Sequence, residues 1–177
     1  MKKKQLEKLS TLAKIVRVNA EANMQNLVPD EYILEKNREL MNNEIVLFES
    51  NLSKLNTSIN ILNEQIKQKE NELKENEAKL IILRNSHLLL TKEIDIKKVL
   101  VHDKIISEVD FLQLKRRYND TDLELKNTQS MIPILNSSIA ELYENIEDAK
   151  EKYKNDAKNQ IVESYSKLQT IEEEINL

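Results

Sequence analysis

Residues 100 to 107 read Leu-Val-His-Asp-Lys-Ile-Ile-Ser, and this stretch decides the fold because a heptad pattern stops there on both sides. Before and after it, apolar residues recur every seven positions, with a second series three residues later, as in a coiled-coil seam. The two patterned regions have nearly equal lengths. They predict an all-α protein with one antiparallel helical hairpin, in which arms at residues 30–99 and 107–176 are joined by a tip at residues 100–106.

The two seams consist mainly of leucine and isoleucine. The first comprises Ile45, Phe48, Leu52, Leu55, Ile59, Leu62, Ile66, Lys69, Leu73, Asn76, Leu80, Leu83, His87, Leu90, Ile94 and Lys97. The second comprises Phe111, Leu114, Tyr118, Thr121, Leu125, Thr128, Ile132, Leu135, Ile139, Leu142, Ile146, Ala149 and Tyr153, and after a slip of one residue Ala157, Ile161, Ser164, Leu168, Ile171 and Ile175. Each arm therefore has one stripe to bury against the other.

The composition excludes several classes of protein. No glycine occurs among the 177 residues, whereas an average usage of roughly 7 % would give about twelve, so sheets with tight turns and phosphate-binding loops are excluded. Charged residues make up 33 % of the chain and the net charge is −4. Because both signs are interspersed, a nucleic-acid binder is disfavoured. No apolar run approaches the ~18 residues of a membrane span, and the absence of cysteine excludes disulfides.

A short segment, residues 1–28, precedes the hairpin, which we assign to residues 29–177. Residues 4–26 predict an amphipathic helix. Its apolar face is formed by Leu6, Leu9, Ala13, Val16 and Ala20. Pro29 disfavours helix in the residue before it, and Asp30 can cap the long helix that follows. The pattern leaves open whether the short helix packs at the base of the hairpin or extends one arm.

Three stretches resemble the hairpin region of the hemolysin D-type membrane fusion proteins, also called periplasmic adaptors. Residues 100–114 resemble the hairpin tip of that family. Arg17-Val-Asn-Ala-Glu-Ala resembles its arginine, hydrophobic, Ala-Glu segment, and Asn43-Glu-Ile-Val-Leu-Phe48 resembles its Glu-x-x-Leu-Phe opening of the long helix. The three matches occur in the family's order, and the resemblance covers nearly the whole chain.

The resemblance implies a function in type I secretion. Members of the family bridge an inner-membrane ABC transporter to a TolC-type outer-membrane channel for protein export. It further implies a periplasmic location, with the inner-membrane anchor and the transporter-binding domains outside these residues. Several copies are expected to associate side by side in a ring.

The resemblance also implies that the tip docks on the channel, commonly through an Arg-x3-Leu-x6-Ser/Thr pattern. Leu100 and Ser107 match its last two positions. Ile96 occupies the arginine position, so the neighbouring Lys97 and Lys98 are candidates for the positive charge.

Two further tip residues are candidates for partner contact. His102 lies within the tip, and Lys104 replaces the glycine that family members often carry there. Without glycine, we expect the turn to close without a left-handed residue. The residues by themselves also allow a plainer interpretation, in which Leu100 ends the seam and Ser107 caps the return helix, and Ser107 can serve both purposes.

No arrangement of residues predicts catalysis, a cofactor or a metal site, and we expect no enzymatic activity. His87 lies at a seam position, where it is interpreted as a core residue that sets the register. The alternative function is a cytoplasmic coiled-coil spacer or tether in a structural protein, which needs no defined tip. A parallel dimer of continuous helices is disfavoured by the break in the pattern.

Overall fold

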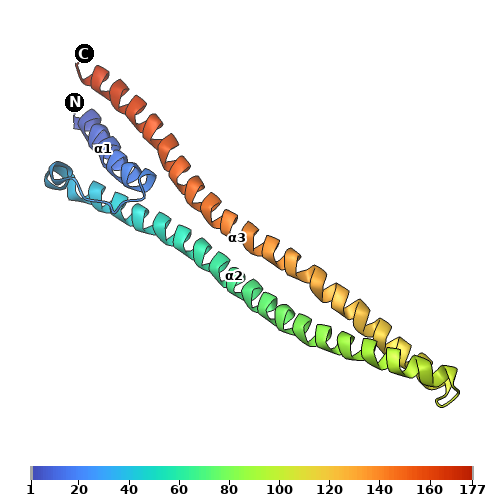
Figure 1. Ribbon diagram of the computed structural model, residues 1–177. Coiled ribbons are helices and arrows are strands. Elements are labelled where there is room, and N and C mark those ends of the chain that lie inside the picture. Colours follow the sequence, from blue (N-terminus) through green and yellow to red (C-terminus); the bar gives the residue numbers. More distant parts are fainter. Residues whose placement is uncertain (1, 177) are drawn as a thin grey trace. The chain divides into compact units, whose positions relative to one another are not determined.

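The computed structural model describes residues 2–176, which form three helices and no strand. Helix α1 spans Lys2–Ala22, α2 spans Glu31–His102 and α3 spans Glu108–Asn176 (Figure 1). The predicted fold class, a long antiparallel two-helix hairpin preceded by a short helix, is confirmed. The chain divides into two compact units, and both long helices contribute to each. Unit 1 is Met1–Asn63 with Glu144–Leu177, and unit 2 is Glu64–Tyr143.

Both predicted seams are observed. Every seam position is buried or half-buried, including the polar residues of the pattern. Leu114 and Leu135 are among the most deeply buried side chains, and the polar Thr128 and Ser164 are buried as well. The heptad pattern therefore identified the buried face of each long helix correctly.

Pro133 lies within α3 without ending it. Proline lacks the N–H group that would bond to the carbonyl of Gln129, one turn earlier. Pro133 and Gln129 are both exposed, so water can reach the unbonded carbonyl. The helix tolerates the proline because it lies on the face away from the seam.

Helix α1 packs against both long helices within unit 1, which answers the question that the sequence left open. Figure 1 shows it between the first part of α2 and the last part of α3. Toward α2, Ala13 forms a buried cluster with Ile33 and Met41. Toward α3, ion pairs link the two helices. They are Lys8 to Glu172 at 2.7 Å, Glu7 to Lys167 at 3.3 Å, and Lys4 to Glu174.

The predicted face of α1 was only partly correct. Leu6 is 49 % exposed, whereas Ile15 and Val18, which lie off the predicted face, are buried. A single-stripe pattern assumes one partner, and α1 has a neighbour on each side, so its burial extends around the helix.

Side-chain and backbone caps set the helix ends near the connector. Helix α1 ends at Ala22, earlier than predicted, because Met24 adopts a left-handed conformation with φ of 52°. The Asp30 carboxylate accepts a hydrogen bond from the Ile33 N–H at 3.1 Å, as the sequence predicted. Asn37 interrupts the first part of α2 in an extended conformation, and its side chain caps the continuing helix by accepting from the Leu40 N–H at 3.3 Å.

Candidate functional site

The turn between α2 and α3 is closed by a left-handed lysine. Lys104 has φ of 57°, its N–H donates to the Val101 carbonyl at 3.0 Å, and the Ile105 N–H donates to the Leu100 carbonyl at 2.9 Å. This pair of bonds is the Schellman motif, which normally places glycine at the left-handed position. The expectation of a turn without a left-handed residue was therefore wrong. A chain without glycine uses lysine there, at a cost of about 1–2 kcal/mol.

The predicted tip boundaries also differ from the structure. Residues 100–102 were assigned to the tip but still belong to α2, so the non-helical segment is residues 103–107. The reason is the Schellman motif, whose bonds return to carbonyls in the last turn and allow the helix to continue to His102.

Ser107 caps α3. Its hydroxyl oxygen accepts a hydrogen bond from the Asp110 N–H at 3.1 Å. Glu108 and Asp110 lie in the first helical turn, where negative charge is favourable. The capping role predicted from the residues is confirmed, and it leaves the exposed Ser107 side chain at a fixed position beside the turn.

The polar candidate residues lie close to this turn, in different surroundings. Lys97 is half-buried and pairs with Glu93 at 2.7 Å, a hydrogen bond that lowers the pKa of the Glu93 carboxyl. Lys98 is exposed. The His102 side chain is also exposed, with Nδ1 at 3.3 Å from the Asp103 carboxylate. Lys97 is thus already engaged within its own helix, and Lys98 is better placed to meet a partner.

Exposed aliphatic side chains surround the turn, and we call them the tip apolar surface. Each is 56–67 % exposed, whereas Leu100 is half-buried at the end of the seam. They are Ile96, Val99, Ile105, Val109 and Leu112. Sequence reasoning concentrated on Leu100 and Ser107 and missed this set. The signal was present, since four of the five are apolar residues off the seam on either side of the break and Ile105 lies within it.

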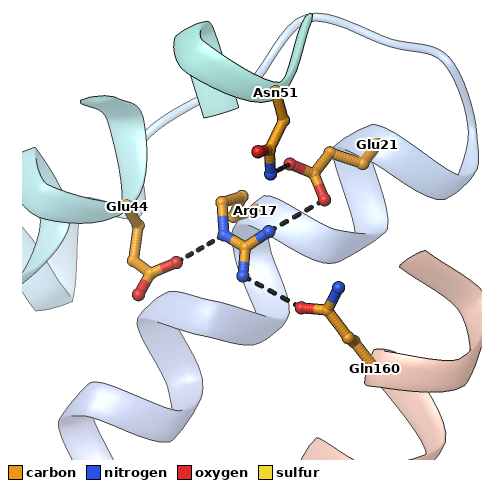
Figure 2. Close-up of polar contacts among 5 residues, drawn as sticks. All are labelled: Arg17, Glu21, Glu44, Asn51 and Gln160. Atoms are coloured by element: carbon orange, nitrogen blue, oxygen red, sulfur yellow. Dashed lines mark hydrogen bonds and ion pairs between the residues drawn. The ribbon is translucent and has the colours of Figure 1, made fainter. Parts of the chain in front are cut away.

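A buried polar network lies elsewhere, in unit 1, around Arg17 (Figure 2). Arg17 Nε donates to Glu44 at 2.6 Å, Nη1 to Glu21 at 2.9 Å, and Nη2 to Gln160 at 3.2 Å. Asn51 donates to the other oxygen of Glu21 at 2.9 Å. Arg17 and Glu21 are only 5 % and 3 % exposed. The network therefore joins α1 to α2 through Glu44 and Asn51, and to α3 through Gln160.

The charges in this network support one another. Burial would by itself lower the pKa of Arg17, but the hydrogen bond to Glu44 and the charge of Glu21 outweigh it and raise that pKa. The guanidinium remains charged, and both Glu21 oxygens have a donor. Such a satisfied network fixes the position of a helix.

His87 lies in the seam of unit 2, as predicted. The centroid of its ring is 4.8 Å from that of Tyr118, and Nε2 is 3.2 Å from one carboxylate oxygen of Asp122. The other oxygen of Asp122 accepts a hydrogen bond from Lys126. Within residues 2–176, no three histidine, cysteine or acidic side chains gather where they could hold a metal ion. In the same range, none of the helices is apolar enough over a sufficient length to cross a bilayer.

Comparison with known proteins identifies the family. The model of the AprE long alpha-helical hairpin family matches residues 3–177. The chain belongs to this family. No curated protein matches it. Among solved structures, the soluble domain of LipC, a membrane fusion protein of a type I secretion system, has the same fold with a TM-score of 0.87. The two are 16 % identical, over 99 % of this chain and 85 % of that one.

The resemblance to membrane fusion proteins, predicted from three short stretches, is thereby confirmed. The structure also shows how two of those stretches are related in the AprE-type hairpin. The arginine of the first stretch, Arg17, binds the glutamate of the second, Glu44. These residues are far apart in the sequence, and their ion pair holds α1 against α2.

Proposed function

We propose that this AprE-type hairpin is the periplasmic part of a type I secretion adaptor. In this proposal it bridges an inner-membrane ABC transporter to a TolC-type outer-membrane channel for protein export, and docks on the channel through its tip. Membership of the family and the fold shared with LipC support the class of protein. The tip apolar surface supports the place of contact.

The tip apolar surface is the observation that carries the docking proposal. Five aliphatic side chains, each more than half exposed, lie around one turn. Single exposed apolar residues are common, but five around one turn favour a surface that another protein covers. Both helix ends at the turn are capped, the end of α2 by the Schellman motif at Lys104 and the start of α3 by Ser107, so the turn has a defined backbone conformation.

Polar groups border this surface, as they border most protein interfaces. Lys98, His102 and Lys104 are exposed around it, and Ser107 adds a hydroxyl that can still donate a hydrogen bond. In the proposed contact, the aliphatic side chains supply most of the affinity and the polar rim sets the orientation. The hairpin then acts by contact and positioning, without catalysis or a cofactor.

Charge introduced at the tip tests this proposal. Ile105→Asp and Val109→Asp place a carboxylate within the tip apolar surface, where docking would bury it without a partner. Val162→Asp is the matched control, because Val162 is at least as exposed but belongs to unit 1.

Export of a substrate is measured in cells that carry the transporter and the channel. We expect a loss of more than about tenfold for each tip variant, corresponding to at least ~1.4 kcal/mol of lost contact. The control is expected to export normally at equal protein levels. Normal export by both tip variants would contradict docking through the tip and favour a spacer that needs no defined tip.

A further inference from the structure

A polar cavity of about 200 Å³ lies in unit 1, where residues of α1, α2 and α3 meet. We call it the junction cavity. Every residue that lines it is charged or carries a hydroxyl group. The hydroxyl groups belong to Ser10 and Thr11 on α1 and to Ser164 on α3. A cavity with such a lining favours an occupant that forms hydrogen bonds.

Ser164 is the seam residue of α3 that lines the junction cavity. It interrupts a run of aliphatic seam residues and is only 3 % exposed. Its hydroxyl group forms no hydrogen bond with any group of residues 2–176. A helical serine or threonine can donate to the carbonyl one turn earlier, as Thr11 does to Glu7 at 2.9 Å. Because a buried hydroxyl group without a partner is costly, Ser164 requires a partner inside the cavity.

Each of the three helices offers one polar group to the junction cavity. Thr11 on α1 uses its hydroxyl hydrogen for the Glu7 carbonyl, so its oxygen can still accept a bond. Glu44 on α2 accepts from Arg17 Nε at 2.6 Å through Oε2, so Oε1 can accept another bond (Figure 2). Ser164 on α3 can donate. A water molecule, with two hydrogens and an oxygen that accepts, matches two acceptors and one donor.

The charges of the lining favour a neutral occupant over an ion. Lys14 and Lys167 are balanced by Glu44 and Glu163, so the lining carries no net charge. Two of these four side chains are already engaged, since Glu44 binds Arg17 and Lys167 pairs with α1 at 3.3 Å. A cation in the cavity would be repelled by the lysines, and an anion would be repelled by the glutamates.

We propose that the junction cavity is a water-binding site in which one ordered molecule bridges Thr11, Glu44 and Ser164. The molecule donates to the oxygens of Thr11 and Glu44 and accepts from the Ser164 hydroxyl. Buried waters typically form about three hydrogen bonds, so these three partners satisfy it. At ~30 Å³ for each water, the cavity has room for about six in all. The others reach the bulk solvent past the exposed Ser10 and Glu163.

This site gives unit 1 a second polar link to α3. The Arg17 network reaches α3 directly at Gln160. The water bridge extends the same network from Glu44 to Ser164, one helical turn further along α3. The position of α3 beside α1 is then fixed by hydrogen bonds on two successive turns.

Removal of the Ser164 hydroxyl group tests the bridge, because its two possible states predict opposite effects. Ser164→Ala should lower the midpoint of thermal unfolding if water bridges the hydroxyl, and should raise it if the hydroxyl has no partner. Ser166→Ala, at an exposed position of α3, is the matched control for the gain in helix propensity. We expect Ser164→Ala to unfold about 2–4 °C below this control. A midpoint equal to or above that of the control would overturn the proposal.

A crystal structure of the chain at a resolution that shows ordered water identifies the occupant. We expect one water molecule within hydrogen-bonding distance of Thr11 Oγ1, Glu44 Oε1 and Ser164 Oγ. A direct bond from Ser164 to another protein group, or density for an ion, would overturn the proposal.

Titration with phosphate and with calcium chloride separates water from an ion in solution. A bound ion would raise the midpoint of thermal unfolding as its concentration rises, and Ser164→Ala would lose part of that rise. For a water site, we expect the difference between Ser164→Ala and the natural chain to stay constant with either salt. A difference that grows with the concentration of one salt would overturn the proposal in favour of that ion.

Discussion

The two units of this protein use the same pair of helices differently. In unit 1, α1 gives the long helices a second surface to cover, and the result includes a buried Arg17–Glu21 pair and a cluster around Ala13, Ile33 and Met41. In unit 2, each helix has only the other as a neighbour and buries a single stripe. Aliphatic residues on the remaining faces stay exposed.

The two units therefore differ in how much of each long helix is buried. With a third helix, unit 1 can bury a charged side chain together with its hydrogen-bond partners, because Arg17 bonds to α2 and α3 as well as to its own helix. A two-helix seam cannot enclose the whole circumference of either helix, so apolar residues off the seam of unit 2 stay exposed. The following variants test that contrast.

The largest effect is expected at Arg17. Arg17→Met leaves the carboxylate of Glu21 buried and that of Glu44 largely buried without their cation, so we expect a loss of about 3–4 kcal/mol in the free energy of unfolding. Urea unfolding followed by circular dichroism measures it. The control is Arg116→Met, at an exposed position in unit 2, with an expected change within about 0.5 kcal/mol. If Arg17→Met lost no more free energy of unfolding than the control, the Arg17 network would not stabilise unit 1.

The next effect concerns the seam of unit 2. Leu114→Ala removes a fully buried side chain and should cost about 2–3 kcal/mol, toward the lower end for buried leucines because a thin seam can partly collapse. Leu112→Ala, two residues away at an exposed position off the seam, should change stability by less than about 0.5 kcal/mol. Amide hydrogen exchange of unit 2 measures both. Equal effects would mean that the seam does not hold this unit together.

The two left-handed residues allow one test in each unit. Glycine adopts positive φ without a steric penalty, so Lys104→Gly in unit 2 and Met24→Gly in unit 1 should each stabilise the protein by about 1 kcal/mol. Lys98→Gly, within α2, should instead destabilise it by about 1 kcal/mol. Thermal unfolding distinguishes the two directions. Destabilisation by Lys104→Gly would refute the left-handed turn.

The smallest effect is the titration of Tyr153 in unit 1. Burial, followed by the negative charge of Glu21, raises the pKa of Tyr153 to about 12, although Arg17 opposes the shift. Because this folded-state value exceeds the ordinary pKa of about 10, the associated stability is present below pH ~10 and is lost as the pH rises toward 12. Ultraviolet titration should show a late tyrosinate step that Tyr153→Phe removes and Tyr165→Phe retains. A step unchanged by Tyr153→Phe would contradict the assignment.

The sequence predicted the hairpin because its information is local and periodic. Each seam residue was identified by spacing alone, and Asp30 and Ser107 were identified as caps from their position before a helix. The same reasoning failed at Lys104 and Met24, where backbone hydrogen bonds outweigh the ordinary preference of those residues for negative φ.

The arrangement of α1 could not be predicted in the same way. A pattern of apolar residues does not say how many neighbours a helix has, so the burial of Ile15 and Val18 was missed. Arg17 and Glu44 were noted only as parts of two separate stretches, and nothing in either stretch indicates that they meet. The tip apolar surface was missed because the residues of interest were chosen by resemblance rather than by exposure.

Site-specific photocrosslinking from the tip tests the central proposal most directly. A photoreactive residue is placed at Leu100, Ser107 or Val109, and at Leu62 as a control midway along the first arm, in an adaptor that works with its transporter and channel. Docking through the tip predicts crosslinks to the outer-membrane channel from the tip positions and none from Leu62. Export-competent complexes without a tip crosslink to the channel would contradict docking through the tip.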